Sequence, residues 1–157
     1  MIQIVPGNIL TVDSGILIQQ VNCKGVMGAG LAKQLREKYP GMYSSYLEYI
    51  RKETNGDLSQ SKVLLGKAYP YHTKSGLTII NCFGQDGYGH DTQQTDYAAL
   101  RAALTIVANT AVCYGSRVAI PWGIGCALAG GDWNLVMDMI LEVFQRCDVT
   151  IYKLPAK

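Results

Sequence analysis

One polar stretch places several acid–base side chains close together. Residues 83–96, FGQDGYGHDTQQTD, follow an apolar run and hold His90, one of only two histidines, between Asp86 and Asp91. An imidazole titrates near neutral pH and a neighbouring carboxylate can orient it, so His90 with Asp91 or Asp86 could move a proton as a general acid or base. The alternative is a solvated loop whose polar residues form local turns. His72, the other histidine, lies near an expected turn and is given no chemical role.

Two glycine-rich stretches could present backbone N–H groups to an anion. Residues 22–30, NCKGVMGAG, and residues 121–133, PWGIGCALAGGDW, each follow an apolar run and precede a segment of helical periodicity. Glycine lets the backbone approach a ligand, and the first N–H groups of a helix carry partial positive charge. If the two preceding strands are neighbours, two helix N-termini face one crevice and could bind a diphosphate. The alternative is that these small residues only permit tight turns and close helix packing.

The elements that must position these loops alternate between short apolar runs and longer helical patterns. Strands are expected at residues 1–5, 15–21, 61–70, 77–83, 117–121 and 149–154. Helices are expected from about Leu31 to Tyr39, from about Met42 to Glu53, after Asp96, and after Asp132 as an N-cap. This alternation predicts an α/β fold in which helices cover a mixed, largely parallel sheet.

Length and composition narrow the class of protein. The 157 residues, 48% of them hydrophobic, predict a single domain over residues 1–157, and a net charge of +2 gives no strong nucleic-acid signal. Because no apolar run approaches the roughly 18 residues of a membrane span, and no secretory signal is visible, we expect a cytoplasmic protein without membrane contact. The five cysteines are widely spaced and form no CxxC pair, which predicts buried, reduced thiols rather than metal ligands. We expect a monomer with no metal and no cofactor.

Three separate stretches, in this order and spacing, resemble the macrodomains, which are ADP-ribose-binding modules with a three-layer α/β/α fold. They are VPGNIL at 5–10, VNCKGVMGAGLAKQLREKYPG at 21–41 and IPWGIGCALAGGDW at 120–133. The second stretch and the Gly-Gly-Asp-Trp ending are most similar to one branch of the family. That branch contains yeast-type ADP-ribose 1″-phosphate phosphatases, terminal ADP-ribose glycohydrolases and DNA-ADP-ribose glycohydrolase antitoxins. The resemblance implies an α/β/α macrodomain whose partner is ADP-ribose or a derivative, including ADP-ribosylated macromolecules.

The resemblance also implies individual ligand contacts. Asn8 stands where the family usually has an acid that accepts a hydrogen bond from the adenine amino group, and an amide oxygen can accept the same bond. Asn22 matches the asparagine at the distal ribose, and Tyr152 matches an aromatic position beside adenine. The other matched positions are Ile9 at the adenine ring, Gly28, Ala29 and Gly30 around the distal ribose and its phosphate, and Ile124, Gly125, Cys126 and Ala127 at the pyrophosphate.

The sequence departs from the glycohydrolases of this branch at their reactive positions. Those enzymes use a lysine on the loop after the central strand, and here no lysine lies between Lys74 and the next expected helix. Some also use an aspartate in the phosphate loop, and Ala129 occupies that position. This difference disfavours a lysine-dependent glycohydrolase.

The resemblance therefore favours a hydrolase that removes the 1″-phosphate from ADP-ribose 1″-phosphate. In this hypothesis Asn22 orients the distal ribose, and His90, assisted by Asp91 or Asp86, activates water or protonates the leaving oxygen. Two alternatives stay open. One is a binding module that reads ADP-ribose without turning it over, and the other is a lysine-independent hydrolase that removes ADP-ribose from modified molecules.

Overall fold

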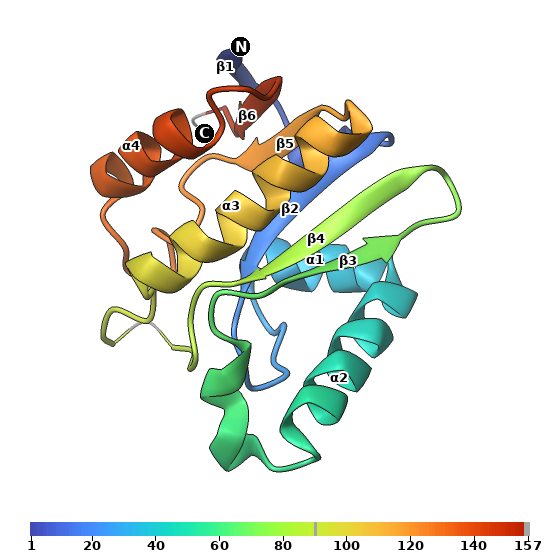
Figure 1. Ribbon diagram of the computed structural model, residues 1–157, viewed down its shortest axis with the longest axis vertical. Coiled ribbons are helices and arrows are strands. Elements are labelled where there is room, and N and C mark those ends of the chain that lie inside the picture. Colours follow the sequence, from blue (N-terminus) through green and yellow to red (C-terminus); the bar gives the residue numbers. More distant parts are fainter. Residues whose placement is uncertain (90, 156–157) are drawn as a thin grey trace.

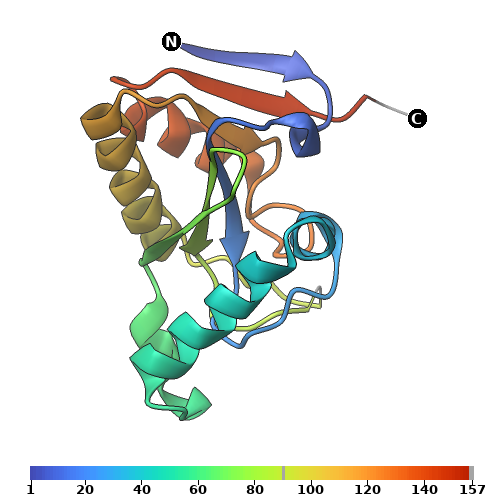
Figure 2. The ribbon, with the colours of Figure 1, turned by 90° about the vertical axis from the view of Figure 1, so that its right-hand side faces the viewer.

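The computed structural model describes residues 1–89 and 91–155, and within them one six-stranded sheet lies between two layers of helices (Figures 1 and 2). The strand order is β1-β6-β5-β2-β4-β3, and every neighbouring pair is parallel except β3 with β4. The strands are β1 (Ile2–Pro6), β2 (Gly15–Val21), β3 (Ala68–His72), β4 (Leu77–Phe83), β5 (Val118–Pro121) and β6 (Val149–Lys153). The predicted mixed, largely parallel sheet is confirmed.

The helices divide between the two faces of the sheet. They are α1 (Gly30–Lys38), α2 (Pro40–Thr54), α3 (Tyr97–Tyr114) and α4 (Trp133–Val143), with 3-10 turns η1 (Ile9–Thr11) and η2 (Leu58–Leu64). Successive side chains of a strand point to opposite faces. Ile16 and Ile18 of β2 therefore pack under α3 and α4, whereas Leu17 and Val21 pack against the α1 and α2 side. The result is the predicted α/β/α arrangement (Figure 1).

The expected strand at 61–70 is wrong over most of its length. Asp57 accepts a hydrogen bond from the N–H of Ser59 and so starts the 3-10 turn η2, which buries Leu64 in the core. Gly66, at a φ of +86°, follows this turn, and the strand begins only at Ala68. The second helix also begins earlier than expected, at Pro40, because proline is well suited to the first turn of a helix.

Helix α3 is long and apolar enough, by length and composition alone, to cross a membrane. One side of it is buried: Leu100, Leu104 and Val107 are fully covered and belong to the core between α3 and the sheet. This is the ordinary position of such a helix inside a globular domain.

The structure places four of the five free thiols at least partly inside the fold and one, Cys113 on α3, at the surface. The expectation that all five are buried is therefore wrong for Cys113, and Cys126 is only partly buried. Burial raises the pKa of Cys23 and of Cys82 to about 12, and that of Cys126 to about 11. Since only a thiolate is a good nucleophile, these three thiols are unreactive at neutral pH.

We predict that iodoacetamide at pH 8 rapidly alkylates one thiol of the native protein, because Cys113 is the one cysteine of the five that is exposed. Mass spectrometry of the intact protein measures the number of adducts. The Cys113→Ser variant should show no rapid adduct, and unfolding in urea should expose every thiol. Rapid alkylation of a second native thiol would contradict this assignment.

Candidate functional site

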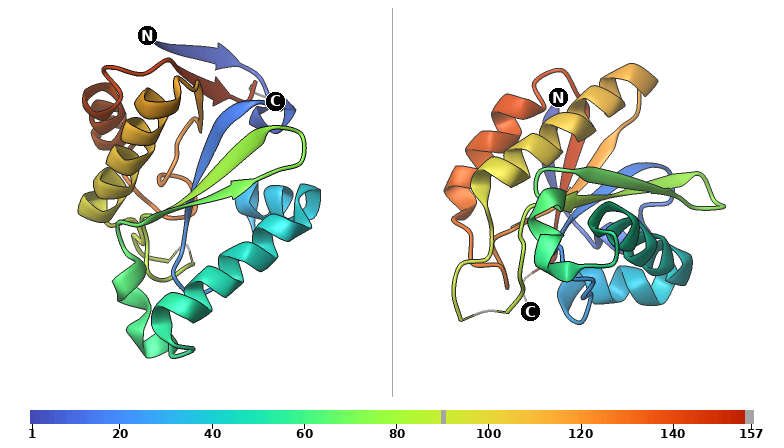
Figure 3. Two further views of the ribbon diagram at one scale, coloured as in Figure 1. Left: turned by 45° about the vertical axis from the view of Figure 1, so that its right-hand side comes forward. Right: turned by 60° about the horizontal axis from the view of Figure 1, so that its bottom comes forward.

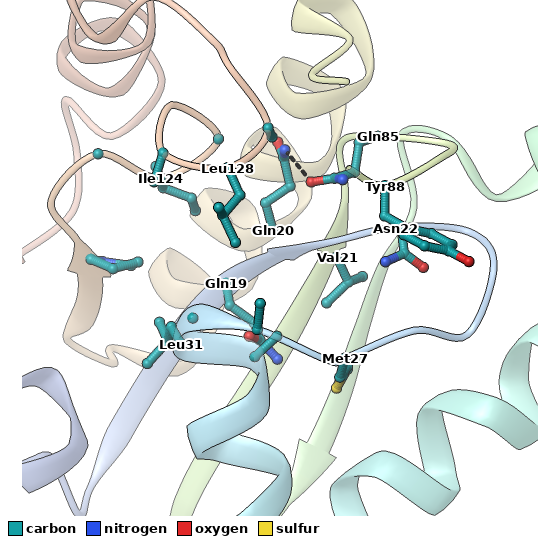
Figure 4. A pocket seen from close by; sticks show the side chains of 18 of the residues that line it. Gln19, Gln20, Val21, Asn22, Met27, Leu31, Gln85, Tyr88, Ile124 and Leu128 are labelled. Atoms are coloured by element: carbon teal, nitrogen blue, oxygen red, sulfur yellow. Dashed lines mark hydrogen bonds between the residues drawn. The ribbon is translucent and has the colours of Figure 1, made fainter. Parts of the chain in front are cut away.

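A cavity of about 620 Å³ opens at the carboxyl ends of β2 and β5, which are parallel neighbours (Figure 4). The two glycine-rich stretches meet here, as the sequence predicts for loops that follow neighbouring strands. The polar loop after β4 joins them, and Figure 3 shows it beside the loop after β5 at one end of the molecule. The cavity is lined by residues 19–22, 26–32, 121–125 and 127–129 with Gln85, Tyr88 and Gly89.

The start of α1 presents free backbone donors to this cavity. Ala29 is the N-cap residue, and no side chain caps the helix. Within the described residues, the N–H groups of residues 28–32 have no hydrogen-bond partner, and all five residues line the cavity. An uncapped helix N-terminus carries a partial positive charge and favours a bound anion.

The second glycine-rich stretch contributes loop amides rather than a helix N-terminus. Asp132 caps α4 by accepting a hydrogen bond from the N–H of Asn134 at 2.9 Å, as the sequence predicts, and this helix start does not line the cavity. The expectation of two helix N-termini at one crevice is therefore wrong for α4. Instead, the N–H groups of Gly123, Gly125 and residues 127–129 lack partners in the part of the chain that the structure describes.

Asn22 lies in the cavity wall, but its side chain holds the first glycine-rich loop in shape. Its Oδ1 accepts hydrogen bonds from the N–H groups of Lys24 at 3.0 Å and Val26 at 3.2 Å, and its Nδ2 donates to the Val26 carbonyl at 2.7 Å. The hydroxyl of buried Tyr46 lies 2.7 Å from the Asn22 carbonyl oxygen and 3.0 Å from Oδ1. These contacts give Asn22 an organising role in the loop that surrounds the cavity.

The predicted acid–base group is not assembled in the cavity by the described residues. Asp86 accepts a hydrogen bond from the Ser61 hydroxyl at 2.6 Å and pairs with the Lys24 ammonium at 3.5 Å, outside the cavity lining. Asp91 is exposed and does not line the cavity. His90 lies outside the described residues, although its sequence neighbour Gly89 is part of the lining. Among the described lining residues, Tyr88 carries the one ionisable side chain.

The residues expected at adenine lie beyond the cavity. Asn8 uses its side-chain oxygen to cap η1, accepting a hydrogen bond from the N–H of Leu10 at 3.0 Å, and Ile9 is buried. Tyr152 lines a separate hollow of about 240 Å³. Its carbonyl oxygen accepts a hydrogen bond from the N–H of Trp122, which does line the cavity, at 2.9 Å. The structure therefore does not bring Asn8, Ile9 and Tyr152 into the same cavity as the glycine loops.

Of the remaining residues predicted to contact the ligand, all but Cys126 line the cavity. Cys126 turns its thiol to the Ile124 carbonyl at 3.4 Å and does not line the cavity. The predicted contact residues that do line the cavity are Gly28, Ala29, Gly30, Ile124, Gly125 and Ala127.

Sequence reasoning missed several side chains of the cavity wall. Gln19 and Gln20 stand at the end of the otherwise apolar strand GILIQQV, and two adjacent polar residues in a central strand were a readable signal. Trp122 also lines the cavity, with the Lys153 ammonium 4.3 Å above its ring and Trp133 beside it. Leu128 and Tyr88 are exposed and lie at the cavity, where they offer apolar surface to a ligand.

Residues 18–140 match the family model of the Macro domain. DNA ADP-ribosyl glycohydrolases of Mycobacterium tuberculosis and Mycobacterium bovis are 27% identical to the chain over 153 residues, which cover 93% of the chain. The chain spans 40% of the length of these relatives. An ADP-ribose 1″-phosphate phosphatase of Meyerozyma guilliermondii is 28% identical over 93 residues, covering 53% of the chain and 51% of that protein.

Solved structures give the same similarity over the whole fold. The macrodomain of Mycobacterium tuberculosis DarG superimposes with a TM-score of 0.81 at 27% sequence identity, covering 99% of both chains. The matched family region, 18–140, contains both glycine-rich loops and the polar loop after β4.

We predict that Tyr46→Phe lowers the free energy of unfolding by about 1–3 kcal/mol, because it leaves buried oxygens of Asn22 without their hydroxyl donor. Urea denaturation measures this change. Tyr69→Phe is the matched control, since within the described residues the Tyr69 hydroxyl has the part-buried Ser45 hydroxyl as its one hydrogen-bond partner, and its loss should cost less. Equal stability of Tyr46→Phe and the wild type would contradict the organising role of this contact.

Proposed function

The chain belongs to the macrodomain family, and from this premise we propose that its cavity binds ADP-ribose. The diphosphate is held between the start of α1 and the loop after β5, and the distal ribose lies beside residues 28–30. The backbone N–H groups of these two segments lack hydrogen-bond partners within the described residues and surround a lining in which the structure describes no charged side chain; this observation carries the proposal. Backbone donors arranged in this way bind phosphate oxygens without a cationic side chain.

The size and surface of the cavity support a ligand of this kind. Its volume of about 620 Å³ falls in the range of small-molecule sites, roughly 300–1,000 Å³. Val21, Met27 and Leu31 supply apolar surface on one side of the glycine loop, and Leu128 supplies it from the loop after β5. Trp122 extends this surface toward Tyr152, so the adenosine end of the ligand would lie over Trp122 on its way to the Asn8 and Tyr152 region.

We further propose that the chain hydrolyses the terminal group of a modified ADP-ribose, with ADP-ribose 1″-phosphate as the first candidate substrate. The phosphatase named among its relatives supports this choice. The free amides would stabilise negative charge as phosphate departs, and His90 would move the proton. Asp91 is the carboxylate left to assist His90, because Asp86 is engaged by Lys24 and Ser61.

Two other activities compete with this proposal. A binding module that does not turn ADP-ribose over is favoured by the lack of a charged side chain in the described lining. Removal of ADP-ribose from a modified macromolecule is favoured by the relatives named DNA ADP-ribosyl glycohydrolase, which match more of the chain than the phosphatase does.

We predict that Gly28→Val abolishes most ADP-ribose binding, with Kd at least about tenfold higher, because a branched side chain would crowd the free amides. Gly28 has no positive φ, and a Cβ there would contact only Val26 at 3.8 Å, so the variant should fold. Isothermal titration calorimetry measures Kd. Ala98→Val, an equal branching at an exposed position of α3, should bind like the wild type. A wild type that fails to bind millimolar ADP-ribose would overturn the proposed function.

We predict that His90→Ala lowers kcat for phosphate release from ADP-ribose 1″-phosphate by about 100-fold or more, because a general acid or base contributes on that order. ADP-ribose binding should stay close to the wild-type value. The assay measures released phosphate and, in parallel, ADP-ribose released from ADP-ribosylated protein and DNA. Wild-type turnover that is unchanged in His90→Ala would remove His90 from the mechanism, and a wild type that binds but releases nothing would identify a binding module.

A further inference from the structure

A network of hydrogen bonds joins the end of β2 to the loop after β4, and Thr95 of that loop continues it to the loop after β5. Gln85 donates from Nε2 to the Gly87 carbonyl at 2.8 Å, and Gln20 donates from Nε2 to Gln85 Oε1 at 2.9 Å (Figure 4). The same Gln20 nitrogen donates to Thr95 Oγ1 at 2.9 Å. The Thr95 hydroxyl then donates to the Gly125 carbonyl at 2.5 Å. Gln20 therefore ties the beginning and the end of the loop after β4 together, and Thr95 makes the contact with the loop after β5.

The direction of each bond follows from the carbonyl oxygens at the two ends. A carbonyl only accepts, so Gln85 must turn its NH₂ group to Gly87 and its oxygen to Gln20. Gln20 must then present its NH₂ group, and both hydrogens are used, one on Gln85 and one on Thr95. Neither the Gln85 carboxamide nor the Gln20 carboxamide can turn over without breaking one of these hydrogen bonds.

The polar atoms of Gln20 face the loops and not a ligand. Its Oε1 is buried and has no hydrogen-bond partner within the described residues. A Cβ on Gly84 would lie 2.2 Å from this oxygen, and a Cβ on Gly125 would lie 3.0 Å from it. The carboxamide is therefore packed between the main chains of both loops, although the Gln20 side chain contributes to the cavity wall.

We propose that Gln20 is a positioning residue that acts through Thr95 of the loop after β4 to set the loop after β5. Thr95 accepts a hydrogen bond from Gln20 and donates one to the Gly125 carbonyl, which also accepts from the N–H of Gly131. The Gly125 N–H has no partner within the described residues and is one of the donors at the cavity. Gln20 thereby fixes the orientation of the amides that contact the diphosphate. This inference rests on the proposed ADP-ribose binding.

The two loops do not depend on Gln20 for their presence beside each other. The N–H groups of Gln94 and Thr95 both donate to the Ala129 carbonyl, at 2.7 and 3.3 Å. These main-chain bonds hold the loops together when the side-chain contact is removed. The loss of Gln20 should therefore change the alignment of the amides while the fold persists.

Three substitutions break the connection at different points. Gln20→Glu keeps the shape of the side chain and removes both N–H donors at neutral pH. Thr95→Val removes the hydroxyl that reaches Gly125, whereas Thr95→Ser retains it and is the matched control. Gly84→Ala displaces the Gln20 carboxamide from a position outside the cavity lining, and Gly84 has no positive φ that would strain alanine.

The experiment measures ADP-ribose affinity by calorimetry and the amide signals of the glycines by ¹H–¹⁵N NMR. We expect Gln20→Glu, Thr95→Val and Gly84→Ala each to raise Kd by about tenfold or more, with Thr95→Ser near the wild type. The Gly125 amide signal should shift in all three variants and not in Thr95→Ser, a signature that a general loss of stability does not produce.

The outcomes separate the two claims. If the wild type does not bind ADP-ribose, the proposed function fails. If the wild type binds and Gly84→Ala and Thr95→Val bind equally well, the positioning role of Gln20 is wrong. Should Gln20→Glu fail to fold, Gly84→Ala and Thr95→Val decide the question, because they disturb the same connection from outside the cavity.

Discussion

The site depends on the parallel pairing of β2 with a neighbour on each side. Because β4 and β5 both run parallel to β2, all three strands end at the same edge of the sheet. The connections that follow them must start side by side, although β2 ends at Val21, β4 at Phe83 and β5 at Pro121. Every feature of the cavity follows from this constraint: the glycine loop comes from β2, the polar loop from β4 and the second glycine loop from β5.

Polar residues at the end of β2 turn this arrangement into a defined shape. A buried carboxamide costs free energy unless it forms hydrogen bonds, and the NH₂ group of each of these side chains finds an acceptor. Gln19 donates to Asn81 on β4, Gln20 donates to two residues of the loop after β4, and Asn22 binds the backbone of its own loop. The interior of the strand holds the sheet together through apolar contacts. The hydrogen bonds at the polar end of β2 fix the positions of the loops, because apolar contacts are not directional and would not set these positions alone.

The fold and the location of the site were readable in the sequence, whereas the roles of individual side chains were not. The alternation of apolar runs and helical periods predicts the sheet, and glycine loops after neighbouring strands predict the cavity. A strand over 61–70 was expected because apolar content does not register the helical turn that Asp57 starts. The positions of Asn8 and Tyr152 outside the cavity depend on how η1 and β6 pack, which is a tertiary property.

The acid–base residues also show that the role of a side chain does not follow from its neighbours in the sequence. Asp86 and His90 are four positions apart, so sequence proximity suggests one cluster, yet the Asp86 carboxylate is committed to Lys24 and Ser61. Lys24 lies within the first glycine-rich stretch, and its ammonium group pairs with Asp86 and donates to the Ser61 hydroxyl. These opposite charges fix the loops from outside, and the described cavity lining is left uncharged. In the proposed function, the attraction for a diphosphate comes from backbone dipoles, which bind an anion but do not transfer a proton. Recognition would then rest on the main chain, and a proton transfer during hydrolysis would fall to an ionisable side chain, for which we propose His90 of the polar loop after β4.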